Sequence, residues 1–503
     1  AAPICSPSRR ALLTARYQSR LGEWAEAYRG TEDGVDASKD PTIGMWLKQA
    51  GYATACYGKW NIGEVAGKSW PGAHGFDDWL IIDHNTGYFD HTNANPNSNG
   101  QEMLFGTGGK RVSHLKGTYL TDIWTDKTLK FIEENQKKPF FIYLPVSIPH
   151  SPLQSPSDTH MKFNEQAKPR TEAGREVYVS MVEYLDKKMG EIFSFLKDKG
   201  LMDNTLIIFT SDNGGMVSGN CWPLKKSKQW LEEGGQRVPT LIQWPKQLPV
   251  GKVSEQMAIM MDASVTVLDA AGATEFVPKD RVLDGKSLLP ILKGEEEVDN
   301  NRSFGWRRRD WGWKGNYIRQ EAYRMGDWKL LRTYEYIGKQ KWSAEFKDQL
   351  FNLKKDLGET QDLAKSMPEK YAEMTKAFDQ WRKETVNYDS DFLISIRDQL
   401  GSPAVLPGEN SPVVLDFSQG KIKDKKVSGY RLFNKGNEDK VNNMKLEEGA
   451  FTFTLKGKIA SPAPLIYKEG MVNYKKFTKA IVCMKLTAVE NTKIGHAKVV
   501  LRH

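Results

Sequence analysis

The sequence predicts an α/β fold in which a mainly parallel β-sheet is sandwiched between helices. Short, almost continuously apolar segments, such as 139–144 and 205–210, have the composition of strands buried on both faces. Segments with a helical spacing of apolar residues alternate with them, which is typical of parallel sheets. In such folds the chemistry is carried by loops beyond the carboxyl ends of the strands.

Each element of this domain has its own local signal. Gly51 and Gly200 end two predicted helices, and Gly58 ends a short β-prone run. The two longer helices carry apolar residues at helical spacing on one face. In chain order we expect a helix at 43–50, a strand at 52–57, a helix at 120–132, a strand at 139–144, a helix at 177–199 and a strand at 205–210.

The pattern changes near residue 300, where a small α+β subdomain is expected. A dense aromatic and basic stretch, Trp306–Trp313, precedes a hairpin at Tyr323–Leu331 and a helix at Met367–Thr385. Further on, alternating apolar and polar residues such as 451–455 predict an extra β-sandwich-like module. The predicted domains are a first domain at 1–300, a subdomain at 301–395, a linker at 396–412 and a β-rich module at 413–503. Because the sequence stops directly after a strand-like run, an incomplete module is one expectation.

Length and composition bound the classes of function. A chain of 503 residues exceeds one ordinary core, so two or three domains are expected. The net charge of +9 comes from basic residues spread along the chain, which fits an anionic substrate and a plain solvated surface equally well. The sequence contains no nucleic-acid-binding motif, no apolar run long enough to span a membrane and no Cys-x-x-Cys pair among its four cysteines.

Cys5 stands at the predicted start of a short helix, and Pro7 suits the first helical position. The unpaired N–H groups and the positive end of the helix dipole favour an anionic oxyester at such a terminus. The plain alternative is a buried cysteine before an ordinary helix.

Polar residues also follow two of the predicted strands. Asp212 and Asn213 offer adjacent oxygen ligands for Ca²⁺ or Mg²⁺, although an Asx-type turn would use the same residues. His150 follows the strand at 139–144, where it can be structural or act as a general acid.

Two lysines are candidates for binding an oxyanion, because a lysine is a point charge suited to that task. Lys59 follows a predicted strand, and Lys228 lies in a basic loop. For the neighbouring Lys225 and Lys226, a solvated surface loop is the preferred interpretation.

Several blocks of the sequence, taken in chain order, resemble the motifs of one family. They are Cys5-Ser6-Pro7-Ser8-Arg9, Gly58-Lys59-Trp60-Asn61, Pro149-His150-Ser151-Pro152, Ser211-Asp212-Asn213-Gly214, and Pro223–Lys228 with Glu233–Pro239. Over residues 1–385 the sequence resembles the type I, formylglycine-dependent sulfatases, which have the alkaline-phosphatase-like fold. Collinear motifs are more specific than any single one of them.

The resemblance implies that a formylglycine-generating enzyme oxidises Cys5 to formylglycine. One oxygen of the aldehyde hydrate, activated by Arg9 and by Ca²⁺ or Mg²⁺, attacks sulfur and the alcohol leaves; expulsion of sulfate then regenerates the aldehyde. The implied catalytic residues are Cys5, Arg9, Lys59, His150 and Lys228; the implied metal ligands are Asp212, Asn213 and Cys5; and the implied substrate contacts are Lys59, His150, Lys228 and Asn61.

The sequence departs from the family pattern in three places. Asn61 stands where the family has the histidine that deprotonates the second hydroxyl when sulfate leaves, and an amide cannot accept that proton. Either His84 or His91 supplies the base, or turnover is slow. Ala15 replaces the glycine of the usual Thr-Gly-Arg. No hydrophobic strand ending in an Asp-Asp pair precedes Cys5, so we expect an N-terminally truncated sequence with an incomplete metal site.

The expected function is hydrolysis of sulfate esters, on a sulfated carbohydrate or another sulfate ester, by a periplasmic or extracellular enzyme. Two alternatives stay open: a phosphoester or phosphonate hydrolase of the same superfamily, and a non-catalytic protein that binds sulfated glycans. Asn61, the missing Asp-Asp pair and the module at 413–503 favour the second alternative. The stretch Trp306–Trp313 can line a sugar site or serve in packing.

Overall fold

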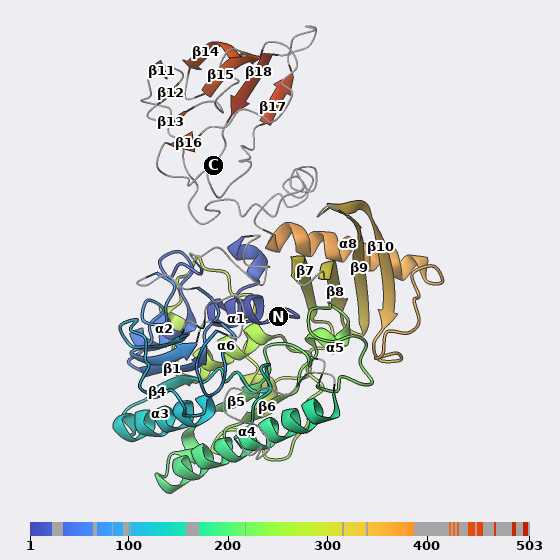
Figure 1. Cartoon of the computed structure of the whole chain (residues 1–503). Helices are drawn as coiled ribbons and strands as arrows, with labels where there is room; N and C mark the ends of the chain where they lie inside the picture. The colour runs from blue at the N-terminus through green and yellow to red at the C-terminus, as the bar shows by residue number, and fades with distance from the viewer. Residues whose placement is uncertain are drawn as a thin grey trace. The chain divides into compact units, whose positions relative to one another are not determined.

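The structure is a computed structural model of the whole chain, shown in Figure 1. It describes residues 1–386 apart from 23–33, 64–67, 83, 94–99, 101, 157–167, 169–170, 217, 314–315 and 339–340, and beyond residue 386 only the backbone of short strands. The chain divides into two compact units, Ala1–Gln399 and Leu400–His503, and each is described by itself.

A four-stranded, mainly parallel sheet forms the centre of the first unit. Its strands are β1 (Ala53–Lys59), β2 (Asp78–Ile82), β3 (Leu104–Gly106) and β4 (Phe140–Tyr143), in the order β3-β2-β1-β4. Strand β1 pairs in parallel with both β2 and β4, and only β3 runs antiparallel to its neighbour. The predicted fold class is therefore confirmed.

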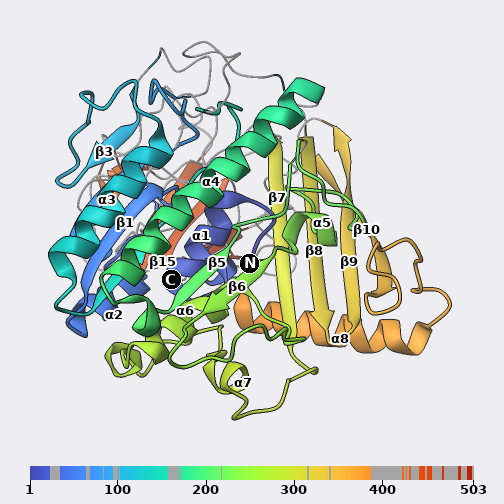
Figure 2. The same cartoon turned by 90° about the horizontal axis from the view of Figure 1, so that it is seen from below.

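Helices cover both faces of this sheet, because the side chains of β1 alternate between two apolar clusters. Ala55 and Tyr57 pack with α3 (Leu120–Asn135) and α4 (Glu172–Asp198), which lie side by side in Figure 2. Cys56 belongs to the cluster on the other face. The helices that contribute to that face are α1 (Cys5–Thr14), α2 (Ile43–Gln49) and α6 (Met260–Ala270).

The remaining short elements of this part connect the larger ones. They are η1 (Gln18–Leu21), η3 (Met202–Asn204), α5 (Glu233–Gln236), η4 (Thr274–Phe276) and α7 (Leu289–Lys293). Within the described ranges, no helix combines the length and the apolar character needed to cross a lipid bilayer.

Two sequence-based expectations differ from the structure. Helix α1 begins at Cys5, so Pro7 is its third residue; an N–H in the first turn has no partner in the helix, so proline is tolerated there as well. Strand β5 (Ile207–Thr210) does not join the parallel sheet but pairs antiparallel with β6 (Thr240–Gln243) in a separate two-stranded sheet. An apolar strand does not specify its neighbour, so periodicity gave no information on this pairing.

An antiparallel sheet forms the C-terminal part of the first unit. Its strands are β7 (Ser303–Trp313), β8 (Asn316–Met325), β9 (Trp328–Gly338) and β10 (Lys341–Asn352), in the order β10-β9-β8-β7. Helix α8 (Pro368–Thr385) packs across it through Met374, Phe378 and Trp381. The predicted hairpin and helix are confirmed.

The second unit contains two four-stranded sheets, as expected of a β-rich module. One has the order β11-β12-β13-β16 and the other β14-β15-β18-β17. The strands are β11 (Ile422–Lys423), β12 (Lys426–Val427), β13 (Tyr430–Arg431), β14 (Val441–Glu447), β15 (Ala450–Leu455), β16 (Tyr467–Lys468), β17 (Lys485–Ala488) and β18 (His496–Val500). The predicted linker at 396–412 lies outside the described residues.

Candidate active site

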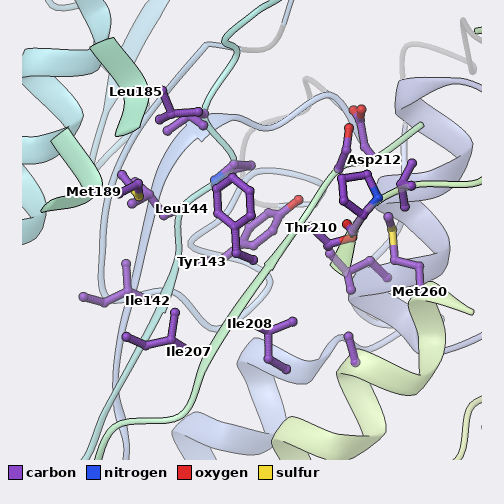
Figure 3. Close-up of a pocket in the computed structure, with 18 of the residues that line it drawn as sticks. Ile142, Tyr143, Leu144, Leu185, Met189, Ile207, Ile208, Thr210, Asp212 and Met260 are labelled. Atoms are coloured by element: carbon purple, nitrogen blue, oxygen red, sulfur yellow. The ribbon is translucent and has the colours of Figure 1, made fainter. Parts of the chain in front are cut away.

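A cavity of about 1480 Å³ lies between β4 and β5 and gathers the predicted site residues except Asn61, which is not among those that line it. Figure 3 shows its apolar part, with Ile142 and Leu144 on one side and Ile207 of β5 nearby, and shows Asp212 beyond the end of β5. The sequence-predicted residues that line the cavity are Cys5, Arg9, Lys59, His150, Asp212, Asn213 and Lys228. They come from the start of α1 and from loops or strand ends, as the carboxyl-end rule predicts.

Cys5 is buried at the first position of α1, after Ile4 in extended conformation. The Nζ of Lys228 donates a hydrogen bond of 3.1 Å to its Sγ. Burial and the Asp212 carboxylate raise the pKa of the Cys5 thiol. The positive charges of Lys228, Lys59 and Arg9 lower it by a larger amount, so that the pKa falls below its ordinary value. The surroundings of residue 5 therefore stabilise negative charge.

Arg9 joins three segments of the site. Its Nε and Nη2 donate to Oδ2 of Asp212 at 3.0 and 2.8 Å, and its Nη1 donates to the carbonyl oxygen of Lys59 at 2.5 Å. Although burial raises the pKa of Asp212, Arg9 and the two lysines hold it far below the usual range. The carboxylate is thus ionised at any working pH, as a metal ligand must be.

Lys59 is buried at the end of β1, and its Nζ donates a hydrogen bond of 2.8 Å to Oδ1 of Asn85. Asn85 follows the neighbouring strand β2 and was not predicted as a site residue. Its position beyond a carboxyl end is the signal that could have identified it.

His150 is neutral in this site. Burial, together with Lys228 and Lys59, lowers its pKa well below the ordinary value. Its Nδ1 lies 2.6 Å from the carbonyl oxygen of Ser151, which requires a hydrogen on Nδ1 and leaves Nε2 as an acceptor. A bound anion between the two lysines would offset their charge and favour protonation of Nε2.

Asn61 lies beside the nucleophile, since Ser6 donates a hydrogen bond of 2.8 Å to its Oδ1. Its φ of 59° is left-handed, a conformation that asparagine and histidine adopt more readily than most residues. Neither His84 nor His91 is among the residues that line the cavity. The Nε2 of His91 lies 2.9 Å from the carbonyl oxygen of Thr118.

Asp212 and Asn213 fit a divalent cation as part of its coordination shell. The Oδ1 of Asn213 is buried and has no hydrogen-bond partner in the part of the chain that the structure describes, while its Nδ2 donates to the carbonyl oxygen of Gly214 at 2.9 Å. A buried amide oxygen without a partner beside an ionised carboxylate suits Ca²⁺ or Mg²⁺. Across the described residues, no group of three or more His, Cys, Asp or Glu side chains is placed to hold a metal.

The geometry agrees with comparisons to known proteins. A sequence profile described as Sulfatase matches residues 1–273, which is more than half of the chain. The chain belongs to the sulfatase family. A second profile, described as N-sulphoglucosamine sulphohydrolase, C-terminal, matches residues 226–385 of this sulfatase.

Named sulfatases are among its relatives. N-acetylgalactosamine-6-sulfatase of Homo sapiens is 34% identical over 314 residues, covering 58% of this chain and 57% of that protein. Arylsulfatase J of Mus musculus is 26% identical and covers 76% of this chain and 69% of that protein. The chain thus spans less than 60% of the length of the N-acetylgalactosamine-6-sulfatases that it matches.

Solved structures agree with the fold. Ps i-CgsB, solved in complex with k-i-k-neocarrahexaose, is 28% identical with a TM-score of 0.63, covering 80% of this chain and 88% of that chain. The PsFucS1 sulfatase from Pseudoalteromonas sp. has a TM-score of 0.60 at 23% identity, covers 77% of this chain and 82% of that chain, and shows the fold alone.

In this sulfatase, the first part of the aromatic and basic stretch serves in packing. Trp306 is buried against Phe304, and the buried Arg307 forms an ion pair of 2.7 Å with Glu321. The side chains of Trp311 and Trp313 lie outside the described residues.

Proposed function

We propose that this chain carries the catalytic site of a hydrolase for sulfate esters of carbohydrates, with residue 5 as nucleophile after oxidation to formylglycine. The observation that carries the proposal is the hydrogen bond from Lys228 to Sγ of Cys5, in a buried pocket shared with Arg9 and Lys59. Three cations around one nucleophile suit the transfer of an anionic sulfuryl group. Family membership supports the reaction class.

The proposed reaction has two stages, transfer of the sulfuryl group to residue 5 and release of sulfate. One hydroxyl of the aldehyde hydrate attacks sulfur, the bond from sulfur to the ester oxygen breaks, and the alcohol leaves with a proton. The other hydroxyl would then pass its proton to solvent water, because Asn61 cannot accept it; the bond from carbon to the sulfate oxygen would break, sulfate would leave and water would rehydrate the aldehyde. Lys59 and Lys228 hold the sulfuryl oxygens, Arg9 orients Asp212, and His150 passes the proton to the departing alcohol once anion binding has favoured its protonation.

Asp212 and Asn213, with the oxygen of residue 5, would hold Ca²⁺ or Mg²⁺. The cation lowers the pKa of a bound hydroxyl and offsets negative charge on the sulfuryl group. The partnerless Oδ1 of Asn213 supports this assignment.

We infer that the surroundings of the cavity between β4 and β5 suit a further parallel strand, such as the family's strand with an Asp-Asp end. Both β4 and β5 lie at the end of their sheets, so each has an edge without a described partner strand. Apolar side chains of both strands line the cavity, with α4 and α6 contributing from either side. These features match the surroundings of a central strand in a sheet covered on both faces.

The names of similar proteins support a carbohydrate substrate. One relative is an N-acetylgalactosamine-6-sulfatase, and one similar structure holds a neocarrahexaose. A formylglycine-generating enzyme as maturation partner and a periplasmic or extracellular location complete the proposal.

The test is sulfate release by the full-length protein, co-expressed with a formylglycine-generating enzyme. Sulfated galactosamine and galactose oligosaccharides are assayed next to the matching phosphate esters, with the Cys5→Ala variant as control. Sulfate release that is lost in the control supports the proposal. Faster phosphate release would favour the phosphoester hydrolase, and binding of sulfated glycan without release would favour the non-catalytic protein.

A further inference from the structure

A buried ion cluster joins the antiparallel sheet to the segment that carries Lys228. Lys329 of β9 is fully buried, and its Nζ lies 2.8 Å from Oε1 of Glu233 and 2.8 Å from Oε1 of Glu359. Both glutamates are buried as well. None of these three residues is among those that line the cavity, so this cluster does not contact a substrate bound there.

The two carboxylates explain how the ammonium group of Lys329 can be buried. Burying an ammonium group costs several kcal/mol unless partners with good geometry surround it, and here two carboxylates do so. Burial raises the pKa of Glu233, but Lys329 outweighs burial and the pKa falls to about 2. Removing Lys329 would leave two carboxylates facing each other without water, which is a much more costly state.

Glu359 binds both ends of the segment 225–236. Its Oε2 accepts a hydrogen bond of 2.7 Å from the backbone N–H of Glu233, and its backbone carbonyl accepts one of 2.9 Å from Nζ of Lys225. The N–H of Gly234 donates to the carbonyl oxygen of Lys225 at 2.9 Å and closes the segment on itself. The ion cluster thus fixes a closed loop.

The same segment holds the catalytic groups through its backbone. The N–H of Lys228 donates to the carbonyl oxygen of Gly215, and the N–H of Gly214 donates to that of Gly235, both at 2.8 Å. These two bonds fix the loop that begins with Asp212 and Asn213. A β-carbon on Gly214 would overlap the carbonyl oxygen of Gly234, so the two loops touch closely.

A third backbone contact reaches the nucleophile. The N–H of Gln229 donates to the carbonyl oxygen of Pro3 at 2.8 Å, two residues before Cys5. One segment therefore holds Lys228 against the stretch that leads to Cys5.

We propose that Lys329 is a positioning residue of the active site, which acts through Glu233 and Glu359 on the segment 225–236 and so sets the place of Lys228. The antiparallel sheet is then part of the catalytic apparatus. The catalytic meaning of the position of Lys228 rests on the proposed function, whereas the position itself is a property of the folded chain.

The chain offers a matched control on the same strand. Arg332 of β9 forms a buried ion pair of 2.8 Å with Asp348, and neither residue is among those that line the cavity. Arg332→Met removes a buried ion pair of the same sheet but leaves the Lys329 cluster in place. The Arg332→Met variant therefore shows how far a general loss of stability alone changes amide exchange in the site.

Amide hydrogen exchange of the full chain tests the proposal without any substrate. In Lys329→Met we expect exchange in 212–216 and 225–237 to be about tenfold faster than in the unsubstituted chain, at a temperature where both are folded, because these loops lose their anchor. In Arg332→Met the same peptides should keep their rate. Unchanged peptides in Lys329→Met, or equal acceleration in both variants, would overturn the proposal.

A second pair of variants covers the case in which Lys329→Met does not fold. Glu359→Gln keeps the shape of the side chain and leaves one carboxylate on Lys329, so a smaller acceleration confined to the same peptides is expected. Lys329→Met/Glu359→Gln leaves one buried carboxylate, Glu233, where Lys329→Met leaves two; it should therefore restore folding, while exchange in the same peptides stays faster than in the unsubstituted chain because the ammonium anchor is gone. Acceleration in Glu359→Gln that spreads over the whole sheet would contradict a positioning role.

The kinetic consequence is measured separately in the matured enzyme. Misplacement of a catalytic group lowers kcat more than binding, so Lys329→Met/Glu359→Gln should lose about ten- to a hundredfold in kcat with little change in KM. An inactive parent enzyme would count against the proposed function and would leave the exchange result intact.

Discussion

Lys228 and Cys5, which are 223 residues apart in the sequence, are joined by a hydrogen bond of 3.1 Å from Nζ to Sγ. The bond gives Lys228 a position from which it can bind a group attached to residue 5. The neighbouring Lys226 is exposed, and its Nζ lies over the ring of Trp230. The two lysines of one loop therefore have different surroundings.

Lys228→Ala should lower kcat by about a hundred- to a thousandfold, the usual effect of removing one donor to a developing anion. Lys226→Ala is the matched control and should retain nearly full activity. Initial rates of sulfate release from an aryl sulfate give both values. Equal losses in the two variants would mean that Lys228 acts only as part of a general positive field.

Asn61→His should increase turnover by supplying a proton acceptor, an effect of about a hundredfold or more for a positioned general base. The left-handed φ of 59° is one that histidine tolerates. In the parent enzyme, rapid mixing should reveal a burst of alcohol release before slow sulfate release, and Asn61→His should remove the burst. Asn61→Gln, which adds no base, should keep it; a parent without a burst would place the slow step elsewhere.

Removal of divalent metal should abolish activity and lower Tm. Addition of Ca²⁺ or Mg²⁺ to the full-length protein should raise Tm according to its affinity, and Asp212→Asn with Asn213→Ala should remove this response. The exposed Asp203, shortly before β5, provides the control Asp203→Asn, which should respond as the parent does. A metal response that survives in the Asp212 and Asn213 variants would exclude these residues as ligands.

Stability should fall steeply in acid because of Glu321. This buried carboxylate accepts hydrogen bonds from Arg307 at 2.7 Å and from the Tyr334 hydroxyl at 3.1 Å. Burial raises the pKa of Glu321, but Arg307 and other arginines lower it to about 2 from an ordinary 4.5. A lowered pKa contributes stability above the unfolded value, about 3 kcal/mol here, which is lost as the pH falls from about 4.5 to 2.

The variant Glu321→Gln tests this pH dependence. It should be less stable than the parent at pH 7, and the difference should shrink as the pH falls toward 3. Urea unfolding at several pH values gives the free energy of unfolding for both proteins. A difference that is constant with pH would show that the carboxylate contributes through packing alone.

Sequence reasoning succeeded where a local pattern is sufficient. The run at 52–57 and the periodicity at 120–132 appear as β1 and α3, and the motif residues meet in one cavity because parallel strands bring their carboxyl ends to one edge. It did not predict Asn85, or the pairing of β5 with β6. Such pairings depend on which distant side chains or edges meet, and periodicity carries no information on that.

Lys329 illustrates the same limit. In sequence it is one lysine of a predicted hairpin, where lysines are ordinarily exposed. In the structure it is fully buried, because Glu233, 96 residues earlier, and Glu359 surround its ammonium group. Only the assembled sheet reveals that this charge lies inside the protein.

Strands β4 and β5 each have an edge without a partner strand among the described residues, and this has a consequence for handling the protein. Unpaired strand edges are templates for pairing with other molecules, and apolar side chains beside them favour self-association. Phe209 on β5 and Leu241 on β6 are 40% and 67% exposed, so the short sheet adds exposed apolar surface next to such an edge. The chain should therefore oligomerise with rising concentration and bind fluorescent dyes that detect apolar surface.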